Sequence, residues 1–127
     1  MKSIPVNSTT APSASGGYSQ ARLIDGASQL LFVSGQVPET NEGVVPAGFE
    51  AQAELTWKNL VAQLSAAGMG VENLVKVTTF LSSREHAAAN REVRSKFLRN
   101  HSPALTVIIA GIFDEQWLLE IEAIAAA

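Results

Sequence analysis

The spacing of apolar residues divides this chain into segments of two kinds. Five short segments, at residues 18–24, 30–33, 74–81, 105–112 and 118–124, either alternate apolar and polar positions or are continuously apolar, which is typical of strands. Two longer segments repeat apolar residues every three or four positions, which is typical of helices. The pattern predicts the order β-β-α-β-α-β-β, in a two-layer α+β domain with two helices on one face of a mixed sheet.

The first helix is predicted to begin at Phe49 and to end before Gly68, which is a suitable C-cap residue. The second helix is predicted to follow the pair Ser82 and Glu85, which has capping-box spacing, and to reach about Arg99. The apolar stripe of the first helix consists of Phe49, Ala53, Trp57, Leu60, Val61, Leu64 and Ala67.

Turn residues predict two hairpins. An Asp-Gly pair at residues 25–26 separates the first two strands, and an Asp-Glu pair at residues 114–115 lies between the last two. The sequence therefore predicts that each of these strands pairs with the one that follows it.

The last strand carries two carboxylates, Glu120 and Glu122, which alternation places on the same face. Such a carboxylate can act as a general acid or base, because apolar neighbours raise its pKa. An exposed strand face would have the same pattern, so the spacing alone leaves both interpretations open.

The penultimate strand, residues 105–112, is apolar on both faces. Two helices can cover only one of these faces. The other face is therefore expected to contact a second subunit.

The first 17 residues are rich in Ser, Thr, Pro and Gly and are predicted to form a flexible N-terminal arm. Residues 18–127 are predicted to form a single domain. The chain has no cysteine, which excludes disulfides, thiolate nucleophiles and iron–sulfur clusters. Its net charge of −3 provides no general attraction to nucleic acid or to an anionic membrane. The N-terminus lacks the features of a targeting signal, so we expect a cytoplasmic protein.

Few other residues suggest chemistry. The only histidines, His86 and His101, lack the spacing of metal ligands. Gly35 follows a buried strand and either allows a ligand to come close or simply forms a turn. Five basic residues of the second helix form either a phosphate-binding stripe or, as the pattern favours, a solvated face. These residues are Arg84, Arg91, Arg94, Lys96 and Arg99.

Several short motifs, in order and spacing, resemble the Rid family, also known as the YjgF or L-PSP family. The resemblance extends from about residue 18 to residue 125. It rests on Tyr18-Ser19-Gln20, LLFVSGQVP at 30–38, Ala67-Gly68, VKVTTFL at 75–81, Asn90, Pro103-Ala104 and EIEAIA at 120–125.

The resemblance implies a chorismate-mutase-like fold assembled as a homotrimer, with a small-molecule ligand bound in a cleft between subunits. It also implies hydrolysis of reactive enamines or imines to 2-oxo acids and ammonia, without a metal or organic cofactor. Neither nucleic acid nor a membrane is an expected partner.

The family comparison also assigns site residues. It implies that Glu120 is the water-activating carboxylate and that Tyr18, Gly35 and Asn90 are retained cleft residues. Leu105 stands where typical members have an arginine that binds the substrate carboxylate, and Val107 stands where they have a cysteine. Leucine offers neither the charge nor the planar hydrogen-bonding fork of a guanidinium.

Because of Leu105, we expect a divergent member with a less charged cleft and with lost or altered deaminase activity. One alternative is an ordinary 2-iminobutanoate/2-iminopropanoate deaminase whose arginine comes from elsewhere, with Arg22 and Arg91 as candidates. The other is a trimer that binds a metabolite for regulation and does not turn it over.

Overall fold

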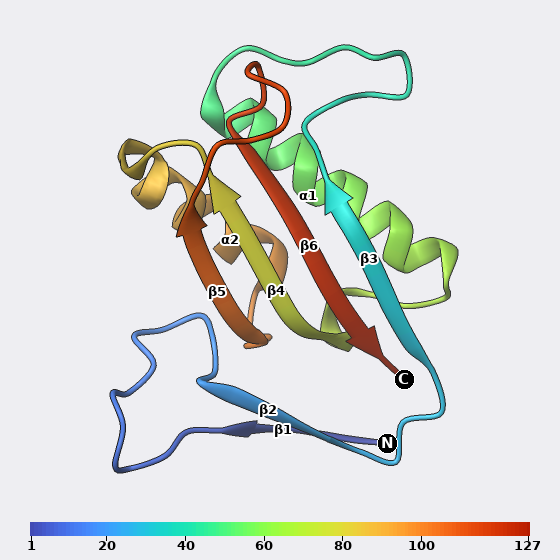
Figure 1. Ribbon diagram of the computed structural model, residues 1–127. Helices are drawn as coiled ribbons and strands as arrows, with labels where there is room; N and C mark the ends of the chain where they lie inside the picture. The colour runs from blue at the N-terminus through green and yellow to red at the C-terminus, as the bar shows by residue number, and fades with distance from the viewer.

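A computed structural model describes residues 1–127 and contains six strands and two α-helices (Figure 1). The strands are β1 (Lys2–Val6), β2 (Ala21–Asp25), β3 (Leu30–Gln36), β4 (Leu74–Leu81), β5 (Ala104–Ile109) and β6 (Leu119–Ala126). The helices are α1 (Phe49–Ala66) and α2 (Ala87–Leu98), and two short 3-10 helices are η1 (Val71–Asn73) and η2 (Arg84–His86).

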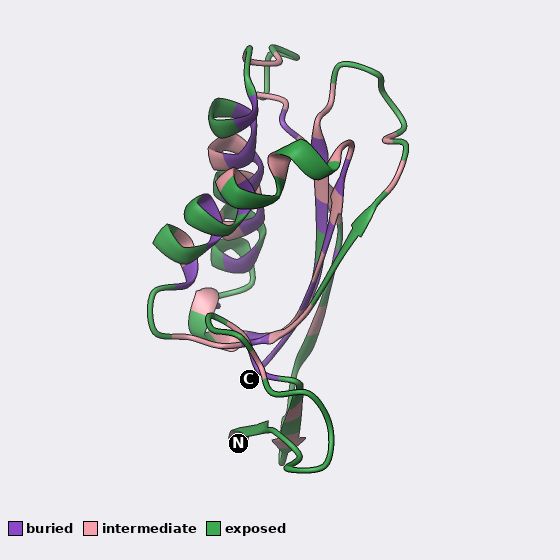
Figure 2. Cartoon of the chain, turned by 90° about the vertical axis from the view of Figure 1, so that its left-hand side faces the viewer, coloured by how far each residue is buried: buried purple, intermediate pink, exposed green.

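Four strands form the main sheet in the order β3-β6-β4-β5. Only β4 and β5 are parallel, and α2 makes the crossover between them. Both helices lie on the same side of this sheet (Figure 2). The predicted two-layer α+β fold, with a mixed sheet, is therefore confirmed.

Both predicted hairpins are wrong. β2 pairs with β1, whereas β3 pairs with β6. β4 lies between β5 and β6, so the last two strands are not hydrogen-bonded to each other. β5 is parallel to β4 and forms the edge of the sheet, and its residues 106–109 are exposed in the single chain.

A strand occupies part of the segment predicted to be a flexible arm. β1 pairs antiparallel with β2 along its whole length, from Lys2 opposite Asp25 to Val6 opposite Ala21. The Arg22 side chain reinforces this pairing, because its Nε donates to Ser3 Oγ at 2.7 Å. Low apolar content therefore did not prevent regular structure here, because long-range hydrogen bonds supply the order.

The core lies between the helices and the sheet. The predicted stripe of α1 is buried except at Val61, which is half-buried, and Ala67, which is exposed beyond the helix end. Side chains less than 2% exposed include Trp57, Leu60, Leu64, Leu74, Val77, Leu81, Leu119 and Ile121. Burying each of these aliphatic side chains contributes roughly 1.5–3 kcal/mol to folding.

The end of α1 follows the sequence prediction. The N–H of Met69 donates to the carbonyl of Leu64, and the N–H of Gly68 donates to that of Ser65, both at 2.9 Å. These two bonds form a Schellman motif, in which Gly68 has the left-handed conformation with a φ of 73°.

The start of α2 differs from the prediction. Ser83, and not Ser82, accepts a hydrogen bond from the Glu85 N–H at the beginning of η2. Ser82 continues the sheet instead, because its N–H donates to the carbonyl of Leu118 at 3.0 Å.

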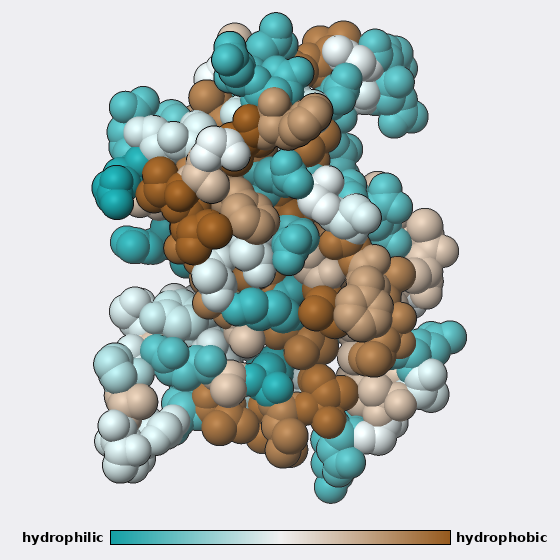
Figure 3. All heavy atoms as spheres, in the orientation of Figure 1, coloured by the Kyte–Doolittle hydropathy of each residue, from teal (hydrophilic) through white to brown (hydrophobic).

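The second face of the sheet has no layer packed on it in this chain. Phe32 is 69% exposed and Ile108 is 43% exposed on this face, and apolar side chains are visible over the sheet in Figure 3. That a second subunit covers this face stays a prediction. Neither helix has the length and apolar character that a membrane crossing requires.

Replacing Gly68 with Ala is expected to lower the free energy of unfolding by about 1–2 kcal/mol, because a Cβ disfavours the left-handed conformation. Urea denaturation measures the change. Gly111→Ala is the matched control, since an added Cβ there meets no atom within 4 Å and its φ is not positive. Equal destabilisation by both substitutions would contradict this account of the helix end.

Candidate functional site

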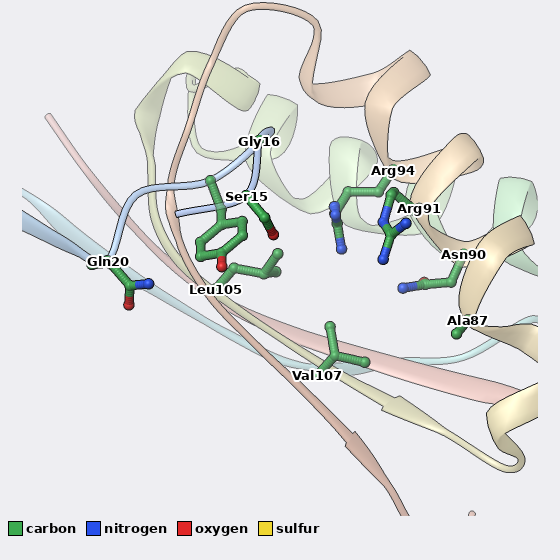
Figure 4. A pocket seen from close by; sticks show the side chains of 10 residues that line it. Ser15, Gly16, Gln20, Ala87, Asn90, Arg91, Arg94, Leu105 and Val107 are labelled. Atoms are coloured by element: carbon green, nitrogen blue, oxygen red, sulfur yellow. The ribbon is translucent and has the colours of Figure 1, made fainter. Parts of the chain in front are cut away.

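A pocket of about 420 Å³ lies between α2, the edge strand β5 and the segment that leads into β2 (Figure 4). Four of the residues predicted for the site, Tyr18, Asn90, Leu105 and Val107, line it together. The remaining lining residues are Ser15, Gly16, Gln20, Ala87, Arg91 and Arg94.

Helix and strand periodicity explain the two main walls. Asn90 and Arg94 are one turn apart on α2 and therefore share a face. Leu105 and Val107 are two residues apart on β5, and they lie opposite the buried Val77 and Thr79 of β4. Both residues of β5 thus point to the helix side of the sheet, where they form the apolar floor of the pocket.

Ser19 fixes the third wall. It is 2% exposed, its N–H donates to the carbonyl of Pro103 at 3.0 Å, and its Oγ donates to that of Ser102 at 2.7 Å. These bonds attach the N-terminal segment to the residues that precede β5. The attachment holds Tyr18 and Gln20 beside the pocket.

Tyr18 is influenced by its neighbour Ser15. Hydrogen bonding from the side chain and backbone of Ser15 lowers the pKa of Tyr18 from its ordinary value of 10.0. The positive charge of Arg94 acts in the same direction. The phenol is thus in an environment that favours negative charge on its oxygen.

Arg94 was one of the five basic residues for which the sequence favoured a solvated face, and the structure shows that for Arg94 this was wrong. It is only 6% exposed, yet its guanidinium has no hydrogen-bond partner and no ion pair in the chain. Burial lowers its pKa, and the charge of Arg91 lowers it further. In Figure 4 the side chains of Arg94, Arg91 and Asn90 all extend from α2 toward the cavity.

That the cleft is less charged than in typical family members stays a prediction, but the pocket of a single chain does contain positive charge. Arg91 and Arg94 line it, and no carboxylate does. Of the two arginines considered as replacements, Arg91 lies at the pocket. Arg22 does not, because its guanidinium donates to Ser3 and, at 2.9 Å, to the carbonyl of Ser102.

Glu120 and Gly35 lie together, but away from this pocket. Glu120 alternates with the buried Leu119 and Ile121 and lies opposite Phe80, which places it on the uncovered face of the sheet. The register of β3 against β6 shifts close to Gly35, between Val33 and Gln36. A Cβ on Gly35 would overlap the Glu120 carboxylate and lie 2.7 Å from its Cδ, so glycine is needed for this approach.

Neither histidine lies at the pocket. The ring of His86 stacks on Phe49 at 4.5 Å between centroids, and His101 Nε2 is 2.7 Å from the carbonyl oxygen of Leu74. The chain brings together no group of three His, Asp or Glu side chains that could hold a metal ion.

The chain is a small α+β protein with a pocket between a helix and the edge strand of its sheet. The family model for Endoribonuclease L-PSP matches residues 8–127. The mitochondrial protein mmf2 of Schizosaccharomyces pombe is 37% identical, with 99% of each chain covered. The 2-iminobutanoate/2-iminopropanoate deaminase of Rattus norvegicus is 32% identical, over 94% of this chain and 87% of the relative.

A solved structure is similar over its whole length. It is YyfB of Yersinia pestis, described as a protein of unknown function of the conserved Rid family, with a TM-score of 0.85, 27% identity and 100% of both chains covered. The chain belongs to the Rid family, as its motifs indicated.

The ionisation of Tyr18 gives a direct test of the pocket. Since Tyr18 is the only tyrosine, a spectrophotometric pH titration reports on it alone. We expect a midpoint below 10.0, the ordinary value, and a Ser15→Ala variant with a higher midpoint than the parent. Because the folded state releases the proton at lower pH, this group makes stability rise with pH between its folded and unfolded pKa values. A midpoint unchanged by Ser15→Ala would contradict the assigned cause.

Replacing Gly35 with Ala is expected to displace the Glu120 side chain, because the new Cβ occupies its position. A double-mutant cycle with Glu120→Ala measures the coupling, which we expect to be about 1–2 kcal/mol, since truncating Glu120 relieves the overlap. Additive effects on urea denaturation would show that the two residues do not share this space.

Proposed function

We propose that this protein hydrolyses small reactive imines or enamines to a carbonyl compound and ammonia, in a cleft between two copies of the chain. The observation that carries the proposal is the gathering of Tyr18, Asn90, Leu105 and Val107 around one pocket. A relative with 32% identity is named a 2-iminobutanoate/2-iminopropanoate deaminase, which supports the same class of reaction.

The position of Glu120 supports the involvement of a second copy. In one chain, the sheet separates the Glu120 carboxylate from the pocket floor at Leu105 and Val107. Packing the uncovered face of one copy against the pocket side of another would bring a carboxylate to the cleft. The exposed Phe32 and Ile108 are the apolar residues that such packing would bury. A closed ring of three copies is the arrangement we propose.

In the proposed reaction, the Glu120 carboxylate of the neighbouring copy accepts a proton from water as the oxygen attacks the imine carbon. The resulting carboxyl group passes this proton to the imine nitrogen, giving a carbinolamine and restoring the carboxylate. The carboxylate then takes the proton of the carbinolamine hydroxyl and transfers it to the amino nitrogen, while the carbon–nitrogen bond breaks, the carbonyl group forms and ammonia leaves. The reaction consumes one water and releases one ammonia for each imine.

Asn90 and Tyr18 would orient the substrate. Asn90 is 3% exposed, and its side-chain amide has no hydrogen-bond partner in the chain although it reaches the pocket. Since the amide opens into the pocket, a ligand or water there can complete its hydrogen bonds. Its amide is therefore available to the reacting group.

The test generates 2-imino acids in situ with an amino-acid oxidase and follows their loss with and without the protein. We expect the protein to accelerate hydrolysis and Glu120→Gln to reduce the rate by about 10²–10⁴, the usual contribution of a general acid or base. Glu122→Gln is the matched control, since Glu122 lies on the same face of β6 and is exposed. Its rate is expected to stay within about threefold of the parent.

Two results would contradict the proposal. One is the absence of acceleration for every imine supplied. The other is an equal loss of rate in Glu120→Gln and Glu122→Gln, which would indicate an effect of net charge and not a catalytic carboxylate.

A further inference from the structure

Two arginines of α2 give the pocket a positive charge. Arg94 is 6% exposed, its guanidinium opens into the cavity without a partner in the chain, and Arg91 lines the same cavity. The structure has only two ion pairs, Lys96 with Glu54 and His86 with Glu85, and neither involves these arginines. Partial burial disfavours the charged form of Arg94, and an anion bound in the cavity offsets that cost.

We propose that Arg94 and Arg91 form a subsite for a ligand with two negative charges, which under the proposed function is the 2-imino acid of a dicarboxylic amino acid. The identity of the ligand as an imino acid rests on the proposed function, whereas the subsite for two negative charges rests only on the pocket and its charges.

The charges of the pocket favour two negative groups over one. Two guanidinium groups and no carboxylate line the cavity, so a ligand with a single negative charge leaves one positive charge uncompensated. Each guanidinium can bind a carboxylate through two parallel hydrogen bonds. The mutual repulsion that lowers the pKa of Arg94 is also relieved when anions lie beside both groups.

The remaining walls suit the carbon chain of such a ligand. Leu105 and Val107 provide an apolar floor, and the volume of about 420 Å³ exceeds that of a five-carbon acid. With leucine at position 105, the positive charges of the pocket lie on the helix wall, across the cavity from the strand (Figure 4). A bound anion would therefore lie near α2 and not near β5.

A competing explanation is that a carboxylate of a second copy neutralises Arg94. In that case Arg94 stabilises the assembly and is not free to bind a ligand. If Arg94 binds a ligand, its removal weakens ligand binding. If Arg94 pairs with a second copy, its removal changes the oligomeric state.

The first experiment measures binding by calorimetry with two five-carbon acids, 2-oxoglutarate with two carboxylates and 2-oxopentanoate with one. We expect 2-oxoglutarate to bind at least tenfold more tightly to the parent protein. Arg94→Gln should weaken its binding by about 30-fold or more, as loss of a charge-assisted bond in a cleft does. Arg91→Gln should weaken it less, because Arg91 is exposed and its charge is better screened.

Arg84→Gln is the matched control. It removes the same charge from an exposed arginine next to the same helix, but outside the pocket. We expect no change in its affinity for 2-oxoglutarate beyond about twofold. Arg94→Lys should bind with intermediate affinity, because lysine keeps the charge and loses the bidentate geometry.

A stability measurement checks that the variants fold and separates a binding role from a structural one. Arg94→Met should raise the Tm of the ligand-free protein, because it replaces a partly buried charge that has no partner in the chain with an apolar chain of similar length. A lower Tm would instead indicate that Arg94 supports the fold or the assembly, and would count against the proposal.

Three outcomes overturn the proposal. These are equal affinity for the two acids, unchanged affinity for 2-oxoglutarate in Arg94→Gln, and dissociation of the oligomer by Arg94→Gln without loss of ligand affinity. The third would favour pairing of Arg94 with a second copy.

A second experiment distinguishes this inference from the proposed function. Amino-acid oxidases supply 2-iminoglutarate from glutamate and 2-iminopentanoate from norvaline, and the loss of each imine is followed. Arg94→Gln should lower kcat/KM for 2-iminoglutarate at least tenfold more than for 2-iminopentanoate, mainly through KM.

If neither imine is hydrolysed while 2-oxoglutarate binding depends on Arg94, the anion subsite stands and the deaminase function fails. If both imines are hydrolysed equally well and Arg94→Gln changes neither rate, the subsite fails and the deaminase function stands.

Discussion

The pairing of β6 with both β3 and β4 is the constraint on which the rest of the structure depends. Its alternation directs Leu119, Ile121, Ala123 and Ala125 into the helix layer and leaves Glu120 and Glu122 on the opposite face. A slip of one residue would place carboxylates against α1, so the hydrophobic pattern permits only this register. The same pairing fixes which residues can meet in one chain. Glu120 can approach Gly35 on the neighbouring strand, while the pocket forms on the other side of the sheet.

The sequence predicted local structure well and long-range pairing poorly, and the reason is physical. Apolar spacing and glycine geometry determined α1 and its end at Gly68, because those signals act within a few residues. The choice of strand partners depends on contacts between distant segments, so two turn signals at residues 25–26 and 114–115 were misleading. The apolar content of residues 2–6 did not predict the strand β1, since this strand is ordered by its pairing with β2 and by the hydrogen bond from Arg22.

The candidate site was predictable only in part, for a related reason. The family motifs identified Tyr18, Asn90, Leu105 and Val107, and the structure brings these four together. Arg94 was grouped with exposed basic residues, because the sequence alone did not show which basic residues of the second helix face the solvent and which face the sheet. Its spacing of four from Asn90 was the available signal, since residues one turn apart share a face. That Arg91 and Arg94 of α2 line the same pocket as Leu105 could be seen only once helix and strand were packed together.

The edge strand β5 also has a consequence for how the protein is made. Beyond Ala104, which forms a bridge with Ser19, its outer backbone groups have no partner strand, and Val107, Ile108 and Ile109 are each at least 40% exposed. An apolar edge of this kind is a template for pairing with strands of other chains. In a newly synthesised chain, folding therefore competes with aggregation through this edge, and the competition becomes less favourable as the concentration of unfolded chains rises.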